Sequence, residues 1–228
     1  MTKANKIDKK DILLFKAASS LNLRHCQLKN FLNFLNTNKV KKPIRFAFIE
    51  KDAPLINNLS LRENIYLDSV PNTLISSKDF QLNQYLEKSG NKYLLEIYKR
   101  LLLLDETPDK VDIVTRKLAA LLKGLIQDCD YLFLDHPEEY LNEENLEIFT
   151  QALAIQTGLT GKIVFIHSDK ESLWVEHVSK TVVRDENFEF LVEPTFNKAL
   201  KAKFAVLEND QVDDNEGHLE ISGIKKAA

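Results

Sequence analysis

Glycine is scarce in this sequence. Only six glycines occur among the 228 residues, and the first of them is Gly90, whereas average usage is about 7%. A loop that wraps successive backbone N–H groups around a phosphate depends on glycine, because other residues adopt the required conformations poorly. Any function that needs a glycine-rich loop in the first third of the chain is therefore in doubt.

Cysteines and long apolar runs are also few. Only two cysteines, Cys26 and Cys129, are present, and nothing indicates a secreted protein, so a disulfide framework is not expected. Their spacing is not that of metal ligands either. No run approaches the roughly 20 apolar residues of a membrane span, and the leucine run at 101–104 is expected to lie within a helix. The first apolar run is short, is interrupted by Lys16 and is followed by no small-residue cleavage site. We therefore expect no signal peptide and a cytoplasmic location.

The overall composition is ordinary. Hydrophobic residues make up 44% and charged residues 29%, with a net charge of -3. These values predict one compact domain with a sizeable core, and they give no indication of a nucleic-acid partner.

Short apolar runs alternate with helical patterns. Four of these runs predict buried strands, and a fifth segment predicts a hairpin. An alternation of strands and helices predicts an α/β fold with a mainly parallel sheet covered on both faces. The strands are expected at 12–17, 45–50, 131–135 and 162–167, and the hairpin at 181–192.

Helices are expected between these strands. One is predicted at 25–36, and another carries Leu146, Phe149 and Leu153 on one face after Asn142, a plausible N-cap. The stretch from about 66 to 128 breaks the alternation, because it holds two helix-like segments and no convincing strand.

The predicted organisation has two parts. Residues 1–194 form the main domain, with a helical subdomain at about 66–128, and residues 195–228 form a C-terminal helix and a mobile acidic tail.

Four segments, in order and with matching spacing, resemble the ATPase subunits of ABC transporters. Residues 59–67 resemble the segment after the Q-loop, and residues 118–137 resemble the helix and Walker B strand that follow the signature motif. Residues 140–149 stand in the place of the D-loop and its helix, and residues 163–169 in that of the switch-histidine loop. The resemblance implies a P-loop NTPase-like fold with a mainly parallel sheet and a helical subdomain. Few residues precede the first strand, so it also implies a reduced antiparallel β part.

The phosphate-binding loop departs from the family pattern. Ser19, Asn22 and Arg24 stand where glycines belong, His25 replaces the lysine, and Cys26 replaces the magnesium-binding hydroxyl. A hydrogen bond to a charged group is worth about 1.5 to 3 kcal/mol, so the loss of three would weaken ATP binding by about a thousandfold or more. The resemblance thus implies a subunit that neither binds nor hydrolyses ATP effectively, and we expect no cofactor.

Other motif positions depart as well. Lys51 stands for the Q-loop glutamine, and Asp112 stands for the signature serine that would meet the γ-phosphate bound to the opposite subunit. A carboxylate there would repel that phosphate.

The Walker B and switch positions retain one of the family's residues and depart at two others. Asp135 is retained, but His136 replaces the catalytic glutamate and Ser168 replaces the switch histidine, with His167 one place earlier. Three imidazoles, including that of His25, would then lie near one carboxylate, which is an acceptable zinc ligand set. Histidine at decayed positions needs no metal to explain it, and whether these residues hold a metal stays open.

A partner-docking surface is the remaining expectation. In the family, the region after the Q-loop helps form the groove that receives the coupling helix of the membrane permease. The same residues also suit plain core packing. The candidates for docking are Lys51, Leu59, Leu61 and Glu63.

The main hypothesis is a non-catalytic subunit. It would pair with an active ABC ATPase, a membrane permease, or both, and would lie at the inner membrane only through its partners. One alternative is a stand-alone cytosolic interaction protein on an ABC-like fold. Another is an enzyme with a rebuilt metal site.

Overall fold

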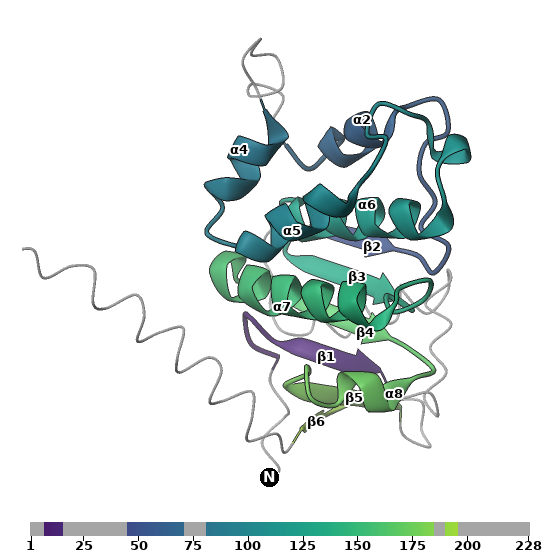
Figure 1. Cartoon of the computed structure of the whole chain (residues 1–228). Coiled ribbons are helices and arrows are strands. Elements are labelled where there is room, and N and C mark those ends of the chain that lie inside the picture. Colours follow the sequence, from purple (N-terminus) through teal and green to yellow (C-terminus); the bar gives the residue numbers. More distant parts are fainter. Residues whose placement is uncertain (1–6, 16–44, 71–80, 185–189, 196–228) are drawn as a thin grey trace, which may run out of the picture.

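The computed structural model describes residues 7–15, 45–70, 81–184 and 190–195 (Figure 1). The helix expected at 25–36 and the segment from 196 onward lie outside the described residues, so those predictions stand as they were. The expected phosphate-loop residues also lie outside the described residues; they are Ser19, Asn22, Arg24, His25 and Cys26.

The described strands form one six-stranded sheet in the order β2-β3-β4-β1-β5-β6. The first five strands in this order run parallel, and β6 pairs antiparallel with β5. The predicted mainly parallel sheet is therefore confirmed, as is the antiparallel pairing of the two strands predicted within 181–192, whose turn lies outside the described residues. The strands are β1 (Ile12–Phe15), β2 (Phe46–Ile49), β3 (Tyr131–Asp135), β4 (Ile163–His167), β5 (Lys180–Arg184) and β6 (Phe190–Pro194).

Helices cover one face of the sheet in Figure 1. Helices α6 and α7 lie in front of the strands, and α5 packs against both. Helix α7 starts at its Asn142 cap, whose side chain accepts a hydrogen bond from the Asn145 N–H (2.8 Å), as predicted. The helices are α2 (Leu61–Tyr66), α4 (Leu82–Glu87), α5 (Lys92–Arg100), the 3-10 turn η2 (Pro108–Lys110), α6 (Ile113–Ile126), α7 (Glu143–Thr160) and α8 (Glu171–Trp174).

The core has two parts because successive strand residues point to opposite faces. On the helix side, Leu14, Leu132 and Ile166 belong to the large aliphatic core. On the opposite face, Phe133 and Phe165 stack with ring centroids 5.0 Å apart within a smaller aromatic cluster.

The leucine run at 101–104 is not helical, contrary to the prediction. Helix α5 ends at Arg100, and Leu102 and Leu103 are 70% and 62% exposed. The first N–H groups of a helix lack partners within it, and the last leucine of the run and a residue shortly after it supply carbonyls to those of α2. Leu104 O accepts from the Arg62 N–H (2.9 Å), and Glu106 O accepts from the Leu61 N–H (2.9 Å). The run is therefore a loop between α5 and η2 that helps to cap the neighbouring helix α2.

The described part of the region from 66 to 128 holds α4, α5, η2 and α6, joined by turns and loops, and it contains no strand. Its status as a separate subdomain stays a prediction. No helix among the described residues is long and apolar enough to span a membrane.

Candidate functional site

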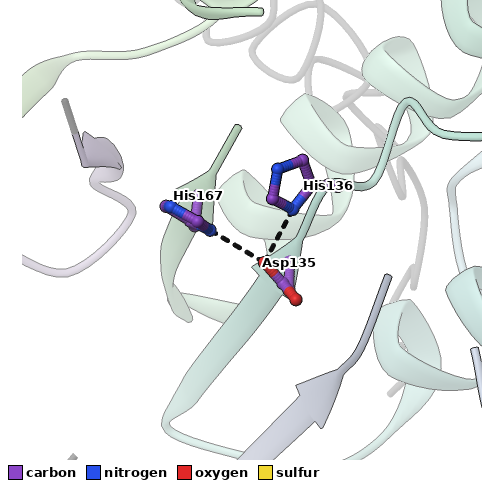
Figure 2. A group of neighbouring side chains, drawn as sticks. All are labelled: Asp135, His136 and His167. Carbon is purple, nitrogen blue, oxygen red and sulfur yellow. Dashed lines mark hydrogen bonds and ion pairs between the residues drawn. The ribbon is translucent and has the colours of Figure 1, made fainter. Parts of the chain in front are cut away.

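Three titratable side chains meet at the carboxyl ends of β3 and β4. Asp135 is the last residue of β3 and pairs in register with His167, the last residue of β4. Because the two strands are parallel, their carboxyl ends share one edge of the sheet. The Asp135 Oδ1 atom lies 2.8 Å from Nδ1 of His167 and 2.8 Å from Nδ1 of His136 (Figure 2). The predicted placement of His136 and His167 beside Asp135 is therefore confirmed, whereas His25, the third histidine of that prediction, lies outside the described residues.

The backbone at His136 is unusual. Its φ is 46°, a left-handed conformation that is uncommon for residues other than glycine. The conformation is held on both sides, because the His136 N–H donates to His167 O (2.7 Å) and His136 O accepts from Lys117 Nζ (3.1 Å). The ring is held too, with Nε2 3.0 Å from Asp169 Oδ2. His136 therefore presents Nδ1 to Asp135 in a fixed orientation.

The charges of the cluster follow from these contacts. Burial acts to raise the pKa of Asp135, but the hydrogen bonds from His167 and His136 outweigh it and lower that pKa to about 2. Burial acts to lower the pKa of His136, yet the contacts with Asp169 and Asp135 outweigh it and raise that pKa above its ordinary value. Both ring nitrogens of His136 face carboxylate oxygens, so the imidazolium form, with two donors, suits its surroundings.

A second carboxylate in the same turn is sealed inside the protein. Glu138 is buried, and its two oxygens accept hydrogen bonds from Ser168 Oγ (2.6 Å) and Trp174 Nε1 (3.0 Å). Ser168 is itself buried and accepts from the Lys170 N–H (2.9 Å). Ser168, at the expected switch position, therefore faces the interior and stabilises the turn through these hydrogen bonds. The sequence analysis did not identify Glu138 or Trp174, although Trp174 is the chain's one tryptophan.

A buried lysine joins helix α6 to the sheet. Lys117 is fully buried, and its Nζ donates to the carbonyl oxygens of Lys51 (2.8 Å), His136 (3.1 Å) and Glu50 (3.3 Å). Burial lowers the pKa of Lys117 to about 8. The sequence analysis missed this residue too, although a lysine among the apolar positions of α6 was an available signal.

The expected signature residue caps a helix. Asp112 is the N-cap of α6, where its Oδ1 accepts from the Thr115 N–H (2.9 Å) and its Oδ2 accepts from Thr115 Oγ1 (2.7 Å). These bonds, led by the one from the Thr115 hydroxyl, lower the pKa of Asp112. Asp112 is therefore an ionised, exposed carboxylate at the start of α6.

The four candidate docking residues have different environments. Leu61 is fully buried in the core, so it is not available to a partner, and this part of the prediction is wrong. Glu63 closes a capping box with Ser60, in which Ser60 N donates to Glu63 Oε2 (2.7 Å). Leu59 and Lys51 are half-buried. Leu61 lies on the inner face of a short helix, which the sequence pattern alone did not reveal.

A groove lies beside these residues, between β2, α6 and the loop after β2; we call it the β2 groove. Its volume is about 310 Å³, and Phe46 and Ile56 remain exposed in its lining. The Asn64 side chain fixes the loop at Ile56 on the edge of the groove, because it accepts a hydrogen bond from the Ile56 N–H (2.8 Å) and donates one to Ile56 O (3.1 Å). The lining residues are Phe46, Ala47, Phe48, Ile49, Glu50, Ala53, Pro54, Leu55, Ile56, Asn64, Ala120, Lys123 and Gln127.

Comparison with known proteins identifies the fold. No protein-family model matches the sequence. Among solved structures, a metal-chelate-type ABC transporter in an inward-facing conformation is similar, with a TM-score of 0.54, 15% identity and coverage of 87% of this chain and 80% of that one. An ATP-binding cassette dimer with ADP and Pi gives a TM-score of 0.53 at 13% identity, covering 78% and 83%. RNase-L inhibitor gives 0.55 at 14% identity, covering 87% of this chain but 37% of its own. The predicted P-loop NTPase-like fold is confirmed.

Proposed function

From the fold that this chain shares with ABC ATPase domains, we propose that it is a non-catalytic ABC-type subunit. It pairs with an active ABC ATPase, a membrane permease, or both, and reaches the membrane only through these partners. The observation that carries the proposal is the hydrogen bonding of the His136 ring. In the family resemblance, His136 takes the position of the catalytic glutamate. A general base needs an unprotonated atom directed at the reacting water. Both ring nitrogens of His136 are instead engaged by Asp135 and Asp169.

Two further positions support the loss of catalysis. In a paired cassette, each ATP lies between the Walker A loop of one subunit and the signature motif of the other. Asp112 would place a carboxylate against that γ-phosphate, and it is already committed to capping α6. Ser168 is buried against Glu138 and so is directed away from a nucleotide.

The β2 groove supports a docking role. It combines exposed apolar side chains, Phe46 and Ile56, with polar residues such as Lys123 and Gln127 at the same surface. An amphipathic helix binds such a groove through its apolar face. A permease coupling helix is the partner of that kind that the family resemblance suggests.

The catalytic part of the proposal is tested with nucleotide. Purified full-length protein is titrated with magnesium and ATP by calorimetry, and phosphate release is measured in parallel. We expect no hydrolysis and no binding below millimolar concentration. Micromolar binding would contradict the proposal.

The docking part is tested with matched surface charges. Ile56 in the β2 groove and Leu173 on α8 are 44% and 43% exposed. We expect Ile56→Glu to release the chain from membranes, because an unpaired charge buried at an apolar interface costs several kcal/mol. Leu173→Glu and Asp135→Ala should remain membrane-associated. Leu61→Glu would place a charge in the core, so it reports on folding and not on docking.

A stand-alone cytosolic interaction protein is the second candidate. The likeness to RNase-L inhibitor favours it, because a cassette fold occurs there in a protein whose name is not that of a transporter. A wild-type chain that never co-fractionates with membranes, or an Ile56→Glu variant that is folded by circular dichroism and fully membrane-bound, would favour this candidate.

A further inference from the structure

We propose that Asp135, His136 and His167 bind a divalent first-row transition-metal ion, with Zn²⁺ as its representative. The proposal is independent of the docking function. One ligand atom from each residue lies within 4.8 Å of the other two. Two imidazole nitrogens and a carboxylate oxygen form a donor set that zinc accepts, and a fourth position would be left to water.

The three ligand atoms lie within 4.8 Å of one another, so an ion could be shared after a local rearrangement of the side chains. Nδ1 of His136 and Nδ1 of His167 each lie 2.8 Å from Oδ1 of Asp135. In a tetrahedral zinc site with bonds of about 2.0 to 2.2 Å, neighbouring ligand atoms are about 3.3 Å apart. Each nitrogen would therefore move from the oxygen by about half an ångström, and the ion would take the place of the two Nδ1 protons.

The histidines are oriented for a shared ion. Their rings are nearly perpendicular, at 88°, with centroids 4.8 Å apart, and both direct Nδ1 toward Asp135 (Figure 2). The side chains of Asp135, His136 and His167 are 13%, 12% and 15% exposed. The cluster is thus mostly shielded, while each of its three side chains keeps some contact with solvent.

An outer carboxylate completes the arrangement. Metal-binding histidines usually donate their second ring N–H to a carboxylate or carbonyl, which fixes the tautomer and the ring orientation. His136 makes this contact through Nε2 with Asp169 Oδ2, at 3.0 Å. The backbone bonds at His136, to His167 O and from Lys117, hold the ring in place before any ion arrives.

A purely structural role explains the cluster less well. Its contacts do link the ends of β3 and β4. However, the buried bonds from Ser168 and Trp174 to Glu138 already link the turn after β3 to the segment after β4. A second link made of two histidines on one carboxylate oxygen adds little to that connection.

The test uses the full-length protein, stripped of metal with a chelator and titrated with Zn²⁺ against a chromophoric competitor. We expect one ion per chain and a zinc-dependent rise in Tm, because a ligand that binds only the folded state stabilises it. Co²⁺ should give the visible absorption bands of a tetrahedral site. His167→Gln, which removes one of three ligands but keeps a hydrogen-bond donor, should weaken binding by at least about a hundredfold, beyond the ten- to hundredfold loss we expect from Asp169→Asn.

His177→Gln is the matched control, because His177 packs against Trp174 and not in the cluster. It should leave zinc affinity unchanged. Equal zinc affinity in the wild type and His167→Gln, or an equal loss in His177→Gln, would overturn the proposal. If His167→Gln does not fold, Asp135→Asn and Asp169→Asn give the same comparison. The wild-type protein alone also tests the proposal, because the absence of tetrahedral Co²⁺ absorption bands would refute the metal site.

Discussion

Two carboxylates in the turn after β3 have contrasting surroundings. Glu138 is buried and receives two fixed donors, the Ser168 hydroxyl and the Trp174 indole N–H. Asp135 lies near the surface and receives two histidines, groups that change protonation state and bind metals. Both carboxylates connect the same two segments of chain. The difference indicates that Glu138 holds the fold together, which leaves Asp135 and its histidines available for chemistry.

The largest expected effect tests the structural half of this comparison. Glu138→Ala would leave the Ser168 hydroxyl and the Trp174 N–H buried without their acceptor. An unsatisfied buried donor costs about 1 to 3 kcal/mol, so we expect the free energy of unfolding to fall by about 3 kcal/mol or more. Urea denaturation followed by tryptophan fluorescence measures it. Glu138→Gln keeps an acceptor and should lose clearly less, whereas equal losses would show that shape and not hydrogen bonding matters there.

A third carboxylate, that of Asp112, allows the effect of a purely local hydrogen bond on the free energy of unfolding to be measured. Asp112→Ala removes the N-cap of α6 and should cost about 1 kcal/mol near neutral pH, while Asp112→Ser keeps a capping oxygen and should cost less. Because its pKa is lowered in the folded state, mainly by the Thr115 hydroxyl, Asp112 contributes stability above its unfolded pKa of about 3.9. The difference between wild type and Asp112→Ala should therefore shrink as the pH falls below about 3.9. A difference that stays constant under acid would show that charge plays no part in this cap.

The smallest effect tests the other half of the comparison. In metal-free protein, His167→Gln should change the free energy of unfolding by less than about 1 kcal/mol, because Gln can still donate to Asp135 and the Glu138 bonds remain. Thermal unfolding by circular dichroism in the presence of a chelator measures it. A loss as large as that of Glu138→Ala would mean that the cluster is part of the structural core, and the contrast between the two carboxylates would fail.

Much of the fold was predictable from the sequence. The strands that end at Asp135 and His167 are short and apolar and are separated by a helix with a clear N-cap, so the pattern predicted both strands and a mainly parallel sheet. The resemblance to ABC ATPases then identified the positions to inspect, and Asp135, His136 and His167 did prove to be neighbours.

The misses have a common cause. Leu61 and the leucines at 101–104 are alike in sequence, yet Leu61 is buried in the core whereas Leu102 and Leu103 are exposed in a loop. One residue of that loop, Leu104, gives its carbonyl to the start of α2. Glu138 and Lys117 were overlooked because charged residues are seldom buried without partners, and those partners lie far away in the sequence. Contacts between segments that are distant in the sequence decided each case, and such contacts leave no local pattern.

Lys117 has an evolutionary consequence. One ammonium group satisfies three carbonyls, from Glu50, Lys51 and His136, at the point where α6 meets the ends of β2 and β3. Replacement by an apolar residue would strand all three carbonyls at once, and no single compensating substitution elsewhere could supply three donors. Descendants of this chain should therefore keep a lysine here while neighbouring surface positions drift. Mutation should therefore meet strong resistance at this buried ammonium.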